Sequence, residues 1–249
     1  MSDDRSLCTL LDWDTGFFGI RIGRFGARRL SEATLRQAEQ WCADHAVRCL
    51  YLLLDADHDA TIRLAERHGL HFADIRVTLA RTASPVASDG SDSEVRPWRD
   101  EDVPVLIHLA GELFFDSRFH MDAAFPPDRA SALYREWIRK SCASSDGAVL
   151  VAPRDGKPVG FITCDPVASA TGRIGLCGVA EEARFRGVGA RLVQAAIQWY
   201  AERGASRVEV VTQGRNLPAQ QLYQRAGFLI QSLELWYHWW IAAAGRRHE

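Results

Sequence analysis

Hydrophobic and polar residues recur along this chain with two periods, and the first third already shows both. Apolar positions at helical spacing begin after Ser31, and a continuous apolar run over residues 49–54 has the length of a buried strand. A short helical pattern over residues 60–68 stops before Gly69, a residue typical of the position just after a helix. Residues 72–79 alternate as a strand does. This part therefore predicts helix, strand, helix, strand.

After residue 95 the same two periods predict a longer series. Asp100 is the expected N-cap of a helix over residues 103–115, with acidic residues in its first turn. Asp155-Gly156 joins two apolar runs and predicts a β-hairpin. The remaining pattern predicts a short strand near residue 95, helices over 129–142, 191–200 and 218–225, and strands over 148–152, 159–163, 174–179, 208–212 and 228–240.

Residues 82–94 separate these two parts, and they are small, polar and without period, which is typical of a flexible linker. We therefore predict domains over residues 1–81 and 95–249. A strand, a helix and a Gly69 turn near residues 51–70 parallel a strand, a helix and a Gly227 turn near residues 208–228. The first domain is interpreted as a truncated, degenerate copy of the second, although two unrelated units can also be alike by chance.

A glycine-rich turn between a predicted strand and a predicted helix carries the main chemical signal. Glycine lets the backbone approach a ligand closely, and a helix N-terminus favours negative charge. Neither the Gly-Lys-Ser/Thr of a P-loop nor the three-glycine dinucleotide spacing is present. The turn therefore predicts a site for another anionic ligand, to which its arginines can add charge-assisted contacts. Its residues are Arg184, Phe185, Arg186, Gly187, Val188, Gly189 and Ala190.

The pattern Arg-x-x-Gly-x-Gly, five residues after the strand-ending Val179, resembles the coenzyme A pyrophosphate loop of the GNAT N-acetyltransferases. The predicted element order over residues 95–240 is also that of this family. The resemblance implies an α+β (mixed α/β) fold with a central sheet flanked by helices, acetyl-CoA as co-substrate and no metal. It further implies that the strand ending at Val179 splays from its neighbour, so that a backbone N–H there faces the thioester carbonyl.

Asn216 and Tyr223 extend the resemblance, because the family has an asparagine that contacts the coenzyme and a tyrosine that protonates the departing thiolate at these positions. Residues seven apart share one helix face. A phenol, with a reference pKa near ~10, stays protonated at neutral pH and can donate to a thiolate. The alternative for Tyr223 is ordinary core packing. The general base stays unassigned among the carboxylates considered, which are Asp165, Glu181 and Glu182. Leu222 replaces an arginine of the family.

Two aromatic stretches, residues 11–20 and 115–120, bear on the acceptor. Together with the degenerate first domain they resemble bacterial GNAT enzymes that acetylate the 4-amino group of a dTDP-linked 4-amino-4,6-dideoxygalactose. The resemblance implies that Arg118 binds the nucleotide diphosphate and that Phe119 and Phe18 form apolar walls. A surface position for Arg118 and a packing role for Phe18 stay open. So do an amino acid, polyamine or antibiotic acceptor, and a non-catalytic acetyl-CoA sensor.

Composition narrows the class of partner. A net charge of −2 provides no basic face for nucleic acid or a membrane surface. The six scattered cysteines form no C-x-x-C pair and predict reduced, mostly buried thiols. The first residues lack a signal-peptide pattern, and no apolar run has the length of a membrane span. We therefore expect a cytoplasmic enzyme with one active site and a small-molecule amine as substrate. A homodimer is implied by the family alone.

Overall fold

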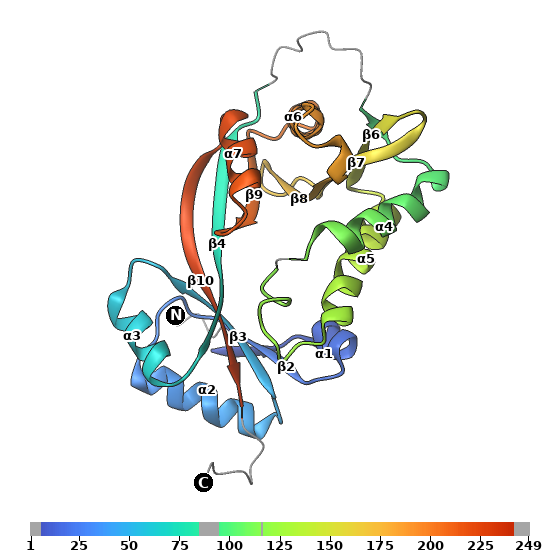
Figure 1. Cartoon of the computed structure of the whole chain (residues 1–249). Coiled ribbons are helices and arrows are strands. Elements are labelled where there is room, and N and C mark those ends of the chain that lie inside the picture. Colours follow the sequence, from blue (N-terminus) through green and yellow to red (C-terminus); the bar gives the residue numbers. More distant parts are fainter. Residues whose placement is uncertain (1–5, 85–94, 116, 242–249) are drawn as a thin grey trace. The chain divides into compact units, whose positions relative to one another are not determined.

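The computed structural model describes residues 6–84, 95–115 and 117–241 (Figure 1). These residues divide into two compact units that do not follow the order of the sequence. Unit 1 contains residues 1–76, 117–126 and 233–249, and unit 2 contains residues 77–116 and 127–232. The predicted boundary at residues 82–94 does not coincide with this division, and residues 85–94 lie outside the described part of the chain.

Unit 1 is built on a strand that is buried along almost all of its length. Its strands are hydrogen-bonded in the order β1-β2-β3-β10, with β2 parallel and β10 antiparallel to β3. Leu50, Leu52 and Leu54 of β3 share one core with Leu35 and Ala38 of α2. The elements are β1 (Cys8–Leu10), α1 (Asp12–Phe18), β2 (Ile22–Phe25), α2 (Glu32–Asp44), β3 (Cys49–Asp55) and α3 (Asp59–Arg67).

Two long strands are each divided between the two units, so each unit contains residues from both halves of the sequence. β4 (His71–Thr82) and β10 (Leu229–Trp240) have 12 residues each, or about 40 Å at ~3.3 Å per residue. The end of β10 pairs with β3 in unit 1, and β4 lies next to β9 in the hydrogen-bonded order. Each half of the sequence therefore contributes the end of its last strand to the other unit.

Unit 2 is a mixed sheet in the order β4-β9-β8-β7-β6-β5, antiparallel from β5 to β8 and parallel between β8 and β9. A Cβ on Gly160 would meet Val188 of α6, whereas a Cβ on Gly178, which faces the other way, would meet Leu113 of α4. Helices therefore cover both faces. The elements are β5 (Arg96–Pro97), η1 (Asp100–Asp102), α4 (Val103–Leu113), α5 (Pro127–Ala143), β6 (Ala148–Arg154), β7 (Lys157–Cys164), β8 (Thr171–Val179), η2 (Glu181–Ala183), α6 (Val188–Glu202), β9 (Arg207–Gln213) and α7 (Leu217–Arg225).

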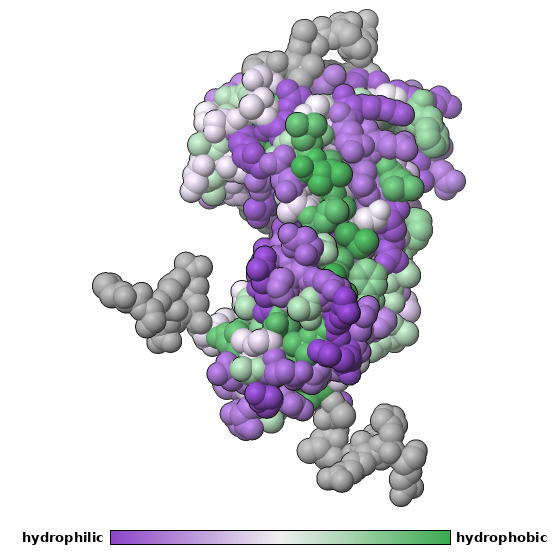
Figure 2. All heavy atoms as spheres, turned by 90° about the vertical axis from the view of Figure 1, so that its left-hand side faces the viewer, coloured by the Kyte–Doolittle hydropathy of each residue, from purple (hydrophilic) through white to green (hydrophobic). Residues whose placement is uncertain are grey.

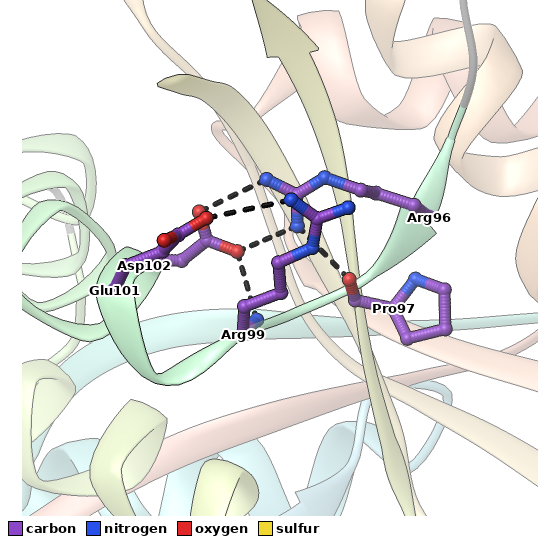
Figure 3. Close-up of polar contacts among 5 residues, drawn as sticks. All are labelled: Arg96, Pro97, Arg99, Glu101 and Asp102. Atoms are coloured by element: carbon purple, nitrogen blue, oxygen red, sulfur yellow. Dashed lines mark hydrogen bonds and ion pairs between the residues drawn. The ribbon is translucent and has the colours of Figure 1, made fainter. Parts of the chain in front are cut away.

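The predicted helices and strands are confirmed to within a few residues, including the hairpin, whose Asp155 and Gly156 both have positive φ. The prediction that Asp100 caps α4 is wrong. The residue before α4 is Asp102. Its carboxylate accepts two hydrogen bonds from Arg96, at 2.7 and 3.0 Å, and one from the backbone N–H of Arg99 at 2.8 Å (Figure 3). The Arg96 hydrogen bond lowers the pKa of Asp102 despite burial. The Arg96–Asp102 ion pair therefore links β5 to the start of α4.

Candidate active site

The two central strands of unit 2 lie side by side for only part of their length. β8 pairs with β9 from Thr171 opposite Arg207 to Ile174 opposite Val210, although β8 continues to Val179 and β9 to Gln213. On its other side β8 stays paired with β7 as far as Val179. Residues 175–179 therefore have one edge that faces away from β7 and is no longer paired with β9. This is the divergence that the family resemblance implied.

The direction of the backbone groups along this edge follows from the pairing with β7. The N–H of Ala180 donates to the carbonyl of Val159 at 2.8 Å, so Ala180 faces β7. Because successive residues of an antiparallel strand face opposite neighbours, the backbone groups of Val179 and Cys177 point to the open edge. The Val179 carbonyl accepts a hydrogen bond from Arg184 Nε at 3.3 Å. The open edge thus presents the Val179 N–H as a donor.

The glycine turn leads into a helix whose first N–H groups are not capped by a side chain. Gly187 has φ +75°, and α6 begins at Val188. The N–H of Arg191 donates to the Gly187 carbonyl at 3.1 Å, which leaves the N–H groups of Val188, Gly189 and Ala190 before the first helical bond. A Cβ on Gly189 would lie 3.1 Å from Leu222 of α7. The positive φ at Gly187 and the close approach of Leu222 at Gly189 therefore explain why glycine occupies both positions. The turn has three backbone N–H groups that could donate to an anion.

Arg191 is a cation of this turn that sequence reasoning missed. Its Nη1 donates to the Arg186 carbonyl at 3.3 Å, and its Nε is buried without a hydrogen-bond partner. An unpaired buried donor costs roughly 1–3 kcal/mol, so an anionic ligand that accepted from Nε would recover that cost. Arg184 and Arg186 are exposed, and Phe185 is fully exposed with φ +58°. The residues present fit the phosphate groups of a coenzyme.

Tyr223 of α7 is buried, with 4% of its surface exposed. Burial raises its pKa well above the usual range, and the neighbouring Cys177 thiol of β8 raises it further. Burial likewise raises the pKa of Cys177 to about 12. Both groups therefore hold their protons at neutral pH. Sequence reasoning missed Cys177, although its position two residues before Val179 places it on the same side of the strand.

Asn216 and the candidate bases have defined positions. Asn216 caps α7, because its Oδ1 accepts from the backbone N–H of Ala219 at 3.1 Å, and its amide NH2 group remains a possible donor to a ligand. Burial raises the pKa of Asp165, which lines a cavity of about 200 Å³ together with Lys140 and Ser144. Glu181 and Glu182 are exposed in η2. None of these positions identifies the general base.

Arg118 lies in unit 1, where its guanidinium packs among aromatic rings. Its Cζ is 4.2 Å from the ring centroid of Tyr51, 4.1 Å from that of Phe119 and 4.3 Å from that of Trp236. Nη1 lies 2.6 Å from Nε2 of His238. The exposed surface position that the sequence left open is therefore excluded, because cation–π contacts and a hydrogen bond fix this side chain.

A hydrogen-bonded chain continues from Arg118 into the core of unit 1. Nδ1 of His238 lies 2.6 Å from Oδ2 of Asp122, which also accepts from Trp240 Nε1 at 2.8 Å. Burial lowers the pKa of His238 to about 4, so the ring is neutral, donates from Nδ1 and accepts from Arg118 at Nε2. Burial alone would raise the pKa of Asp122, but the bonds from His238 and Trp240 lower it to about 2.

Phe18 and Phe119 are buried in unit 1, with 8% and 3% of their surfaces exposed. Both pack against Phe125, with ring centroids 4.8 and 5.4 Å away. They thus have the packing role that the sequence left open for Phe18, and contact with an acceptor stays a prediction for both. The structure groups these residues with Arg118 in unit 1, and it places the residues predicted to bind the coenzyme in unit 2.

Three general expectations bear on cofactors and location. All six cysteines are free, as predicted. Within the described part of the chain, no three His, Cys, Asp or Glu side chains gather in a way that could hold a metal ion. Of the helices in that same part, none has the length and apolar character needed to cross a membrane.

Comparison with known proteins agrees with this geometry. Residues 112–228 match the model of the acetyltransferase (GNAT) family. The chain is 26% identical over 230 residues to the dTDP-fucosamine acetyltransferase of Escherichia coli O6:H1, covering 92% of this chain and 96% of that protein. It is 26% identical to the mycothiol acetyltransferase of Pseudarthrobacter chlorophenolicus over 73% of this chain and 57% of that one. The spore coat polysaccharide biosynthesis protein SpsD of Bacillus subtilis is 26% identical over 59% of this chain and 50% of its own length.

Solved structures show the same fold. A GCN5-related N-acetyltransferase from Sphaerobacter thermophilus superposes with a TM-score of 0.66 at 18% identity, covering 94% of this chain and 76% of that one. A tandem GNAT protein from the clavulanic acid biosynthesis pathway has a TM-score of 0.55 at 16% identity, covering 90% and 76% of the two chains. The likeness extends beyond the residues that the family model matches.

Proposed function

We propose that this chain is an N-acetyltransferase that acetylates the 4-amino group of a dTDP-linked amino-deoxy sugar; the match of residues 112–228 to the GNAT acetyltransferase family and the similarity to a dTDP-fucosamine acetyltransferase support this. The donor is acetyl-CoA, which this family uses. The observation that carries the proposal is the divergence of β8 from β9 beside the uncapped N-terminus of α6. It provides a strand edge for an extended amide chain and three N–H groups for a pyrophosphate.

In the proposed reaction the acceptor amine attacks the thioester carbonyl to form the C–N bond, the amine gives up one proton to a base that stays unassigned, and the C–S bond then breaks. The Val179 N–H at the open edge stabilises the developing oxyanion. Tyr223 donates its proton to the departing thiolate, which its buried, protonated phenol is able to do. The N–H groups of Val188, Gly189 and Ala190 hold the pyrophosphate with Arg184, Arg186 and Arg191, and Asn216 contacts the coenzyme. The remaining turn residues, Phe185 and Gly187, line this site.

The proposal for the acceptor rests on the names of two relatives. The relative aligned over the greatest share of this chain among those above is named for dTDP-fucosamine, and another takes part in making a polysaccharide. An aminated sugar nucleotide agrees with both names, and Arg118, Phe119 and Phe18 stay the proposed acceptor-side residues. The mycothiol acetyltransferases favour a second candidate, a different small amine.

Release of coenzyme thiol from acetyl-CoA, measured against dTDP- and UDP-amino sugars, amino acids, polyamines and aminoglycosides, separates these candidates. Turnover confined to a 4-amino dTDP-sugar is the expected result. Turnover on amino acids or polyamines alone would contradict the sugar assignment and leave the chemistry intact. Tight acetyl-CoA binding without turnover on any amine would indicate the non-catalytic sensor.

A further inference from the structure

Cys177 lies in the part of β8 that is no longer paired with β9. A Cβ on the next residue, Gly178, would meet Leu113 of α4, so Cys177 and Val179 face the other side of the sheet. On that side, a methyl group of Val179 would lie 3.8 Å from a Cβ on Gly189, which is in the first turn of α6. The Cys177 thiol therefore lies at the open edge of β8, on the side of the sheet that α6 covers.

A hydrogen bond joins this thiol to the hydroxyl of Tyr223 on α7. Burial raises the pKa of both groups; the bond raises that of Tyr223 further and opposes the rise at Cys177. The phenol O–H is therefore the donor and the sulfur is the acceptor. The proton of Tyr223 points at a sulfur atom, at the strand edge where the proposed function places the coenzyme.

The burial of this hydroxyl is not imposed by the neighbouring part of the chain. Figure 2 shows hydrophobic residues at the surface in its upper part, and Leu229, shortly after α7, exposes 70% of its surface. Tyr223 itself is buried. A buried hydroxyl without a partner destabilises a fold, so the Cys177 sulfur supplies the acceptor that this position requires.

A second cysteine–tyrosine contact in unit 2 shows what is particular to this one. Tyr200 of α6 likewise has a hydrogen bond with a buried thiol, that of Cys164 on β7. The Tyr200 hydroxyl also donates to the backbone carbonyl of Arg173. Cys164 lies where β7 is paired with a strand on each side. The Cys164–Tyr200 contact is therefore inside the sheet, whereas the Cys177–Tyr223 contact is at an open edge.

We propose that Cys177 is a positioning residue whose sulfur holds the Tyr223 O–H toward the coenzyme sulfur until the departing thiolate replaces it as the acceptor. This inference rests on the proposed function. In the step, the phenol O–H bond breaks and the S–H bond of the coenzyme forms. The Cys177 thiol keeps its own proton and turns to donate to the phenolate, which regains a proton from water after the products leave. A thiol suits this exchange, because it can accept or donate and is a weaker acceptor than a thiolate.

The test is a double-mutant cycle on the full chain, with acetyl-CoA and an amine that the chain acetylates. Cys177→Ala should lower kcat by about tenfold, the effect of one lost hydrogen bond, and leave the dissociation constant for acetyl-CoA unchanged. Cys177→Ser keeps a hydrogen-bonding group and should recover most of that loss. In a Y223F background C177A should cause no further loss, because Cys177 acts only through the phenol.

Cys164→Ala is the matched control, since it removes the thiol beside Tyr200 and should leave kcat unchanged. Thermal unfolding of each variant shows whether the fold persists, and Cys177→Val, which fills the space without a hydrogen bond, should behave as C177A does. Full activity in C177A, or the same loss with and without the Tyr223 hydroxyl, would overturn this inference and leave the proposed function standing. Full activity in Y223F, or no turnover on any amine, would overturn the proposed reaction and this inference with it.

Discussion

Helices α2 and α6 each follow a strand, but side chains cap the start of only one of them. In unit 1, α2 begins at a capping box: Ser31 Oγ accepts from the Thr34 N–H at 3.1 Å, and Thr34 Oγ1 accepts from the Ser31 N–H at 2.9 Å. In unit 2, the residue before α6 is Gly187, which has no side chain that could cap the helix. The first helix satisfies donors of its first turn with its own side chains, whereas the first N–H groups of the second have no side-chain cap.

The strand–helix–strand units that follow have identical lengths. β3, α3 and β4 have 7, 9 and 12 residues, as do β9, α7 and β10. Both helices are followed by a glycine with positive φ, Gly69 in one unit and Gly227 in the other. The seventh helical residue is Ala65 in the first unit and Tyr223 in the second. The two units therefore have elements of the same lengths in the same order, and they differ in their side chains.

The largest expected effect comes from removing the one hydroxyl that distinguishes α7. Tyr223→Phe should lower kcat by about 10²–10⁴, because a positioned acid is lost, while the dissociation constant for acetyl-CoA stays the same. Steady-state kinetics and calorimetric titration measure the two quantities. Tyr237→Phe, a buried tyrosine of unit 1, is the matched control. Unchanged turnover in Y223F would remove Tyr223 from the mechanism.

The buried His238–Asp122 pair of unit 1 makes the stability of the fold depend on pH. Burial lowers the pKa of His238 in the folded chain to about 4, from its ordinary value near 6.5, so below pH 6.5 the unfolded chain binds a proton that the folded chain does not. Stability should therefore fall as the pH drops from 6.5 towards 4, by up to roughly 3 kcal/mol. Asp122 adds a further loss between about pH 4 and 2.

Denaturant unfolding across this pH range measures the slope. His238→Gln removes the titrating ring while it keeps a polar side chain, and it should flatten the dependence between pH 6.5 and 4. An equally steep slope in H238Q would assign the pH dependence to other groups.

Two of the positive-φ glycines, Gly187 and Gly69, permit a matched test of the proposed anion site. Gly187→Ala and Gly69→Ala introduce the same left-handed strain, at φ +75° and +65°, which costs on the order of 1 kcal/mol of stability. Only the first distorts the donors at the start of α6, so only G187A should weaken acetyl-CoA binding, by about tenfold or more. Equal affinity in both variants would show that this turn does not hold the coenzyme.

The smallest effect is expected at the capped helix. Ser31→Ala removes the side-chain acceptor of α2 and should lower the unfolding free energy by about 1 kcal/mol, with no change in acetyl-CoA affinity. Thermal unfolding with and without the coenzyme measures the change in stability and the change in acetyl-CoA affinity separately. A loss of affinity would mean that the two N-termini do not have separate roles.

Local signals in the sequence predicted most of the helices and strands and the glycine-rich turn before α6. The turn at Gly187 and Gly189 has a pattern that depends only on neighbouring residues, and so do the hairpin at Asp155-Gly156 and the buried strand β3. Helix α1 was not predicted, because Gly16 and its aromatic neighbours conceal its period. Asp102 rather than Asp100 receives the hydrogen bonds because Arg96, six residues earlier, determines which carboxylate is fixed.

What could not be predicted depends on residues far apart in the sequence. The chain from Arg118 through His238 to Asp122 joins positions more than 100 residues apart. The contact of Cys177 with Tyr223 and the unpaired Nε of Arg191 likewise follow from tertiary packing. The division of the two 12-residue strands between the units likewise has no local pattern in the sequence.

Backbone amide hydrogen exchange with and without acetyl-CoA reports on the N-termini of α2 and α6 in one experiment. We expect the coenzyme to slow exchange at Val188, Gly189 and Ala190 and at the open edge of β8 around Val179, and to leave residues 32–34 of α2 unchanged. Protection at α2, or none at α6 when the coenzyme is bound, would contradict this expectation.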